Sequence, residues 1–166
     1  MNRSASIEDE IAVHRAELLV YAYRLSGDRD EAEDIVHTAL LKALQSVRSG
    51  VDAQNLRAWL YRIVHNEALT SRRRSRREIA ALVSLPQAAA PADPAQARLL
   101  GKVEREMGLL AEPYRSALQL RYLQHLKVED VADVLQLSVG TVKSQLARGL
   151  RLLTDRMGDG MEGEEA

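Results

Sequence analysis

Basic side chains are concentrated in two segments of a chain that is otherwise close to neutral. The 166 residues carry 23 Lys and Arg against 24 Asp and Glu, a formal net charge of −1. Residues 57–78 hold seven Arg and two Glu, and residues 139–157 hold four basic residues and one Asp. Two separate basic segments predict two contacts with a polyanion such as a nucleic acid. A solvated helix face is the alternative interpretation of each segment.

The C-terminal basic segment has the pattern of a DNA recognition helix. Ser138 is a good N-cap, and the buried stripe that follows consists of Val139, Val142, Leu146, Leu150 and Leu153. The outer face presents Thr141, Lys143, Ser144, Arg148 and Arg151. Small polar side chains let a helix start approach phosphates, and Arg can hydrogen-bond to guanine edges. Because a four-residue link, 136–139, joins this helix to a short apolar helix over 128–135, we predict a helix-turn-helix rather than an ordinary helical hairpin.

The N-terminal basic segment predicts a helix that begins after Asn55, a reasonable N-cap. Its apolar side consists of Leu56, Trp59, Leu60, Ile63 and Val64. Its other side collects Arg57, Tyr61, Arg62, His65, Leu69, Arg72, Arg73 and Arg76. Such a face would set guanidinium groups along a phosphate backbone, with Tyr61 as the best candidate for stacking on a base.

Helical periodicity along the whole chain predicts an all-α protein with two small domains. A first helix over 7–26 is expected to end at Gly27, and Asp28 with Glu31 forms a capping box for the next helix. The next helix carries a complete apolar stripe: Ala32, Ile35, Val36, Ala39, Leu40, Ala43, Leu44 and Val47. Three of the four Pro lie in the Ala-rich stretch 86–94, which predicts a flexible linker. We therefore expect an N-terminal domain over 1–80, a linker over 81–96, a helix-turn-helix domain over 97–158 and an acidic tail over 159–166.

Composition argues against several other classes of protein. The absence of Cys excludes disulfides and thiolate metal sites, and no apolar run is long enough to span a bilayer. No secretory signal is visible, so a cytoplasmic protein is expected. The four His have no spacing typical of a helical metal site, and no phosphate loop or nucleophile elbow occurs. We expect no catalytic residues, metal or cofactor, and a small metal-dependent enzyme is a remote alternative.

Several motifs, taken together, resemble the extracytoplasmic-function (ECF) sigma factors, members of the sigma-70 family of bacterial RNA polymerase. The N-terminal motifs are YRLSGDRDEAEDIV at 23–36 and LRAWLYRI at 56–63, closed by Asn66. The C-terminal motifs are LRYL at 120–123, Val131-Ala132 and SVGTVKS at 138–144. The resemblance covers about residues 15–155, with both halves in the family's order. The chain departs from the family pattern at His37 and Thr38, and at Gln145 and Ala147.

The resemblance implies a role for each surface. The helix face of Asp34, Ile35, His37, Thr38 and Leu41 would dock on the β′ clamp helices of core RNA polymerase, which also holds sigma factors through its β flap. The −10 element of the promoter would be read by residues around the third helix: Asn55, Arg57, Tyr61, Arg62, His65, Asn66, Arg72, Arg73 and Arg76. The −35 element would lie against Thr141, Lys143, Ser144, Arg148 and Arg151.

The same resemblance implies an anti-sigma factor that covers these surfaces. The short apolar runs predict no insertion into a membrane. A LuxR-type regulator, whose recognition helix begins in a similar way, is the main alternative. That hypothesis leaves residues 34–78 unexplained and predicts that the protein binds duplex DNA without polymerase.

Overall fold

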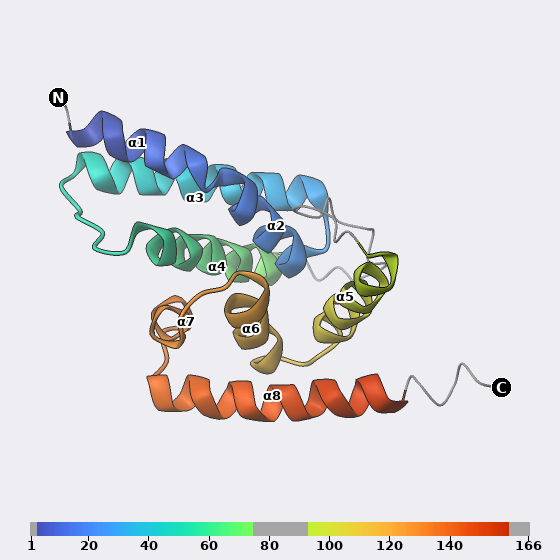
Figure 1. Ribbon diagram of the computed structural model, residues 1–166. Coiled ribbons are helices and arrows are strands. Elements are labelled where there is room, and N and C mark those ends of the chain that lie inside the picture. Colours follow the sequence, from blue (N-terminus) through green and yellow to red (C-terminus); the bar gives the residue numbers. More distant parts are fainter. Residues whose placement is uncertain (1–2, 75–92, 160–166) are drawn as a thin grey trace. The chain divides into compact units, whose positions relative to one another are not determined.

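The computed structural model describes residues 3–74 and 93–159, and within these residues every regular element is a helix, which confirms the all-α class (Figure 1). The chain divides into two compact units. One consists of residues 1–81 with 133–136, and the other of residues 82–132 with 137–166. The first unit contains the helices of the predicted N-terminal domain, and the second contains those of the predicted helix-turn-helix domain apart from residues 133–136.

The predicted first helix is two helices in the structure, α1 (Arg3–Val13) and α2 (Arg15–Ser26). The break lies at His14, whose backbone N–H donates to the carbonyl of Ile11, three residues back, at 3.2 Å. The end of α2 is as predicted: Gly27 adopts a left-handed conformation (φ +75°), and its N–H donates to the carbonyl of Tyr23 at 2.8 Å.

Helix α3 (Arg29–Arg48) is capped as predicted by Asp28, whose carboxylate accepts from the Glu31 N–H at 2.8 Å. The other half of the capping box does not form. The Glu31 carboxylate accepts from the hydroxyl of Ser71, and the Asp28 N–H donates instead to Ser26 Oγ at 3.3 Å. Glu31 therefore connects the start of α3 to the far end of α4 (Leu56–Arg74).

The core of the N-terminal unit lies between α2, α3 and α4, which pack against one another pairwise. The predicted stripe of α3 supplies five fully buried side chains: Ala32, Ile35, Val36, Ala39 and Ala43. Small residues dominate this list, so the neighbouring helices approach α3 closely. The large buried side chains come from the two partner helices, chiefly Leu18 and Tyr21 of α2 and Leu60 and Tyr61 of α4.

The C-terminal unit begins with α5 (Pro94–Gly108), whose N-cap Asp93 accepts from the N–H of Ala95 at 2.9 Å. Helix α5 thus starts inside the range 81–96 that we assigned to the linker. The physical reason is that Pro is well tolerated at a first helical position, where no N–H is needed. The rest of the predicted linker and the acidic tail beyond Asp159 lie outside the described residues, and the remaining domain boundaries stay predictions.

Helix α6 (Tyr114–Leu118) continues into a π-helical turn, η1 (Gln119–Leu123), in which the N–H of Gln124 donates to the carbonyl of Gln119 at 3.0 Å. We expected Pro113 at the first helical position, and it is the N-cap instead. Helix α7 (Val128–Leu135) has the predicted bounds, and α8 (Val139–Asp159) packs against α5 and α6.

Candidate nucleic-acid interface

The turn between α7 and α8 has the geometry of a helix-turn-helix. Only residues 136–138 separate the two helices, and Gln136 has a positive φ of +56°. Ser138 caps α8 as predicted: its Oγ accepts from the N–H of Thr141 at 3.1 Å and lies 2.8 Å from the Thr141 hydroxyl. The first turn of α8 is therefore fixed by side chains before any ligand binds.

The five residues predicted to contact DNA all lie on the exposed side of α8. They are Thr141, Lys143, Ser144, Arg148 and Arg151. The buried side of α8 contains Val142, Leu146 and Leu153, as predicted. Leu150, which we also placed in the buried stripe, is 38% exposed, and Gly149 is buried in its place.

Close contact at Gly149 explains why the buried side of α8 is displaced from Leu150. A Cβ atom on Gly149 would lie 3.1 Å from Leu118 Cδ1 and 3.2 Å from Tyr114 Cβ. Backbone rather than side chain thus faces α6 at this point of α8. The approach also places the guanidinium of Arg148 over the Tyr114 ring, 5.7 Å from its centroid.

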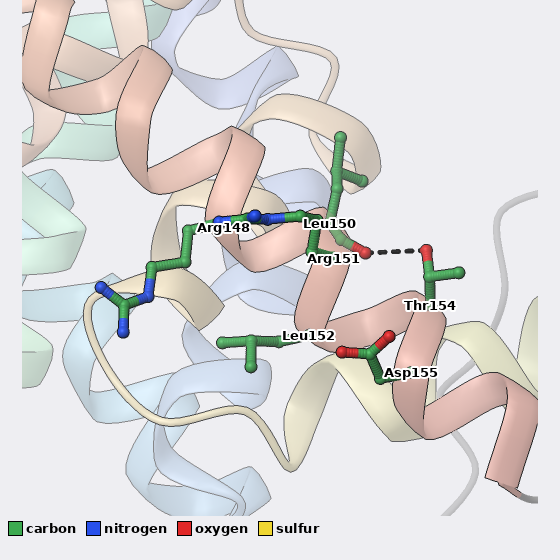
Figure 2. Close-up of a pocket in the computed structure, with 6 residues that line it drawn as sticks. All are labelled: Arg148, Leu150, Arg151, Leu152, Thr154 and Asp155. Atoms are coloured by element: carbon green, nitrogen blue, oxygen red, sulfur yellow. Dashed lines mark hydrogen bonds between the residues drawn. The ribbon is translucent and has the colours of Figure 1, made fainter.

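The second half of α8 presents a surface pocket (Figure 2). Its lining residues are Arg148, Leu150, Arg151, Leu152, Thr154 and Asp155. The Thr154 hydroxyl donates to the carbonyl of Leu150 at 2.8 Å, so this hydroxyl is turned back onto its own helix. The two guanidinium groups are the strongest hydrogen-bond donors of the pocket.

The predicted outer face of α4 is partly wrong, because Tyr61 and His65 are buried. Tyr61 is 0% exposed and packs edge-on against Tyr21, with ring centroids 5.3 Å apart. His65 is 7% exposed, and its Nδ1 lies 2.9 Å from the hydroxyl of Tyr21. The reason is that α4 packs against α2 as well as α3, so a wider arc of the helix is covered than one apolar stripe predicts. Tyr61 in this position has no free ring face on which a base could stack.

Arg57 takes part in an ion pair within the same unit. Its Nη2 donates to one carboxylate oxygen of Glu17 at 2.7 Å, and its Nε donates to the other at 3.0 Å. His14 also contacts this carboxylate. Burial acts to raise the pKa of Glu17, but the hydrogen bonds from Arg57 and His14 outweigh it, so this pKa lies below its usual value.

The Arg57 guanidinium also lies 5.2 Å from the centroid of the Tyr61 ring. The bond to Glu17 raises the pKa of Arg57, and burial raises the pKa of the Tyr61 hydroxyl. Arg57 therefore stays charged and Tyr61 stays neutral at every physiological pH. The charge of Arg57 is matched inside the fold, which distinguishes it from the three cations of α8 that we predicted to contact DNA, Lys143, Arg148 and Arg151.

The other residues assigned to the −10 element differ in their exposure. Asn55 and Asn66 are exposed and Arg62 is half-buried. Asn55 caps α4 as predicted, since its side-chain oxygen accepts from the N–H of Ala58 at 3.1 Å. The backbone of Arg72 and Arg73 belongs to α4, but their side chains and the whole of Arg76 lie outside the described part of the structure.

The residues assigned to core polymerase lie on one face of α3, with one exception. Asp34, His37, Thr38 and Leu41 are exposed, and their spacing places them on a single side of the helix. Leu41 is 47% exposed and supplies the only large aliphatic side chain among these four exposed residues. Ile35 is 4% exposed and belongs to the core, so we withdraw it from the docking surface.

Sequence reasoning missed two residues at the α8 surface, Tyr114 and Gly149. One signal was present in the sequence: a Gly in the middle of an otherwise apolar helical stripe marks a close approach. Among the described residues, no group of three or more His, Asp or Glu is placed to hold a metal ion. No helix of that same part of the chain is long and apolar enough to cross a bilayer.

Comparison with protein families accounts for both units. The family model of sigma-70 region 2 matches residues 11–78, and the model of sigma-70 region 4 matches residues 100–153. The first match covers the segment that a LuxR-type regulator leaves unexplained. It decides between the two hypotheses in favour of a sigma factor.

Relatives of similar length carry the same assignment. The chain is 32% identical to the ECF RNA polymerase sigma factor EcfG of Rhodopseudomonas palustris, covering 86% of this chain and 80% of that protein. It is also 32% identical to the ECF RNA polymerase sigma factor SigL of Mycobacterium tuberculosis, covering 87% and 86% of the two chains.

Solved structures show the same fold. The sigma factor RpoE of Bartonella quintana, solved with the anti-sigma factor NepR, matches with a TM-score of 0.74 and 25% identity, over 92% of this chain and 97% of that one. CnrH, solved with the cytosolic domain of CnrY, matches with a TM-score of 0.67 and 22% identity, over 91% and 86%. From the two regions, their order and the relatives that share them, the chain belongs to the ECF sigma factors of the sigma-70 family, and it directs promoter-specific transcription initiation by RNA polymerase.

Proposed function

We propose that this sigma factor reads its promoter through two surfaces and binds core polymerase through a third. The first surface is the exposed side of α8, which enters the major groove of the −35 element. One observation carries this assignment: Thr141, Lys143, Ser144, Arg148 and Arg151 are exposed together on a helix that follows a three-residue turn. Positions 141 to 151 span about 15 Å of helix, which is the length of four to five base pairs.

The second surface belongs to the N-terminal unit and contacts the −10 element. Its members are Asn55, Arg62 and Asn66, with Arg72 and Arg73 at the end of α4 and, from the sequence alone, Arg76. Exposed amide side chains can hydrogen-bond to the edge of an unpaired base, and Arg side chains can neutralise the phosphates on either side. Extruding a base from duplex DNA costs a few kcal/mol, which these contacts must offset.

The third surface, on α3, binds the β′ clamp helices of core polymerase through Asp34, His37, Thr38 and Leu41. Polar groups around one exposed aliphatic side chain are typical of a protein interface centre with a polar rim. The β flap of core polymerase binds the C-terminal unit. Because none of these roles involves bond making by the chain itself, we propose that it has no catalytic activity and acts in the cytoplasm, where polymerase and DNA lie.

An anti-sigma factor is the third proposed partner, after promoter DNA and core polymerase. The similar sigma factor RpoE of Bartonella quintana was solved in complex with the anti-sigma factor NepR. In this chain the exposed Leu41 lies on the surface that we assign to core polymerase. A protein that covers Leu41 would prevent binding to core polymerase without touching DNA.

Run-off transcription with core polymerase and fragments of the source genome tests the main proposal. We expect transcripts from a subset of fragments only when the protein is present. Leu41→Glu, which places a charge at the centre of the α3 surface, should abolish co-purification with core polymerase. Glu10→Gln, a change at an exposed position on α1, should have no effect and serves as the matched control. Co-purification that survives Leu41→Glu would mean that core polymerase binds elsewhere.

A further inference from the structure

Arg148 differs from Lys143 and Arg151, the other two cations predicted to contact DNA, because its guanidinium has an aromatic neighbour within the fold. The Tyr114 ring of α6 lies under it, 5.7 Å from the centroid. Tyr114 is half-buried, whereas Arg148 is exposed. The guanidinium thus lies over a ring that the unit holds in place, while Arg148 as a whole remains exposed to a ligand.

The ring is held by the close approach of α6 and α8. Tyr114 Cβ and Leu118 lie against the backbone at Gly149, the residue that directly follows Arg148. A Cβ atom at position 149 would have to push Leu118 and the Cβ of Tyr114 back by a few tenths of an ångström. The absence of a side chain at Gly149 therefore lets Tyr114 lie close to α8, where its ring can orient the Arg148 side chain.

A fixed guanidinium has a specific advantage in base recognition. Arg reads guanine through two parallel hydrogen bonds, a geometry that tolerates little error in direction. A free Arg side chain loses rotamer freedom when it binds, and a side chain already stacked on a ring loses less. Contacts to phosphates are less demanding, because an Arg or Lys can make them from many directions.

We infer that Tyr114 is a positioning residue for −35 specificity: it orients Arg148 for base reading, and it does not itself touch DNA. This inference rests on the proposed function of the α8 surface. It assigns the discrimination among −35 bases to one of the five exposed residues, and the general affinity for phosphates to the other cations, Lys143 and Arg151.

The test is a selection by the holoenzyme from promoters randomised over the −35 element. For each position, the readout is the ratio of the most to the least favoured base. Arg148→Ala should bring this ratio close to one at a single position of the −35 element. Tyr114→Leu should lower the ratio at that same position by about two- to fivefold, as expected for loss of one exposed cation–π contact. Tyr114→Phe keeps the ring and should keep the ratio.

Two further variants separate positioning from stability. Arg148→Lys keeps the charge but not the two-pronged guanidinium, and it should lower the ratio at that position without changing the salt dependence of binding. The double variant Tyr114→Leu/Arg148→Ala should match Arg148→Ala alone, because the two residues act through one contact.

Two outcomes would contradict the inference, one through Tyr114 and the other through Arg148. An unchanged ratio in Tyr114→Leu, or an equal loss at every position, would show that Tyr114 only stabilises the unit. A failure of Arg148→Ala to flatten any position would instead contradict the proposed role of Arg148 in the −35 contact, and the inference would fall with it.

Discussion

Helices α4 and α8 look alike as sequences, with an apolar stripe opposed by Arg residues, but they have different surroundings. Helix α8 packs on one side, against α5 and α6, and all five of its predicted DNA contacts are exposed. Helix α4 packs against α2 and α3 together, and two of its predicted surface residues, Tyr61 and His65, are buried. A helical wheel predicts the exposed side correctly for a helix that packs against its neighbours on one side only. For a helix that packs on two sides, the wheel underestimates how much of the helix is buried.

The comparison also separates two kinds of cation. Arg57 of α4 is paired with Glu17 and covers the Tyr61 ring, so its charge stabilises the fold. Arg148 of α8 has an aromatic neighbour and an exposed guanidinium, so its charge is available to a ligand. Counting Arg residues along a segment therefore overestimates the part of the charge that DNA can use.

The largest expected effect is the loss of stability in Tyr61→Ala. At this residue the sequence predicts a side chain that faces DNA, whereas the structure shows a buried one. Tyr61→Ala should lower the free energy of unfolding of the N-terminal unit by about 3–5 kcal/mol, because it empties a large buried site. Urea denaturation followed by circular dichroism measures this. Tyr61→Phe is the control that keeps the ring. A stable Tyr61→Ala protein that has lost only promoter binding would restore the surface role.

Arg148→Glu should act mainly on function. We expect about a hundredfold loss of promoter affinity, because a base contact is replaced by repulsion from phosphates. Affinity for core polymerase should not change, and the melting temperature should fall by no more than a few degrees, because only one exposed cation–π contact is lost. Binding assays with core polymerase alone and with holoenzyme on promoter DNA separate the two. Loss of both activities together would mean that the α8 surface is not confined to DNA recognition.

Glu17→Gln tests whether the Arg57 pair belongs to the fold, and its expected cost is about 1 kcal/mol for a partly exposed pair. The pKa of Glu17 is lower in the folded state, so its contribution is complete above the ordinary Glu pKa of about 4.3 and is lost as the pH falls through the lowered value. The stability difference between wild type and Glu17→Gln should therefore shrink in acid.

The control for this measurement is Glu33→Gln, which removes the exposed pair with Arg29. We expect a change within about 0.5 kcal/mol, as for most surface ion pairs. A Glu17→Gln protein as stable as Glu33→Gln at neutral pH would place Arg57 back among the residues available to DNA.

The smallest expected effect concerns Arg62, the half-buried cation that remains on the proposed −10 surface. Arg62→Ala should reduce the slope of log affinity against log salt by about 0.9, the value for one lost phosphate contact. Holoenzyme binding at several salt concentrations gives this slope. Arg29→Ala, on α3, should leave it unchanged. Equal slopes for Arg62→Ala and wild type would assign Arg62 to the solvated surface.

The ends of the helices were largely predictable because their signals are local. Gly27 ends α2, and Asp28, Asn55 and Ser138 each accept a backbone N–H three residues ahead. These bonds involve only neighbouring residues, so residue type and spacing were sufficient. Helix α7 had its predicted bounds for the same reason: its apolar stripe and the short turn that follows leave little freedom.

The paired roles of distant residues were not predictable in the same way. The sequence predicts that Glu31 completes a cap, whereas Glu31 binds Ser71, 40 residues away. Gly149 lies within a helix predicted from its apolar stripe, and it is the point where α6 approaches α8. In each case the deciding partner lies on another helix, and helical periodicity carries no information about which helix that is.

Sequence alone determined the helical class, the order of the two halves, most helix ends and the basic side of α8, because each depends on residue type at short range. Tertiary structure decided which side of α4 is buried, which Arg charge is neutralised within the fold and which Arg stacks on a tyrosine. Those outcomes depend on how many neighbours cover a helix and at what distance, and only packing of the complete unit sets these quantities.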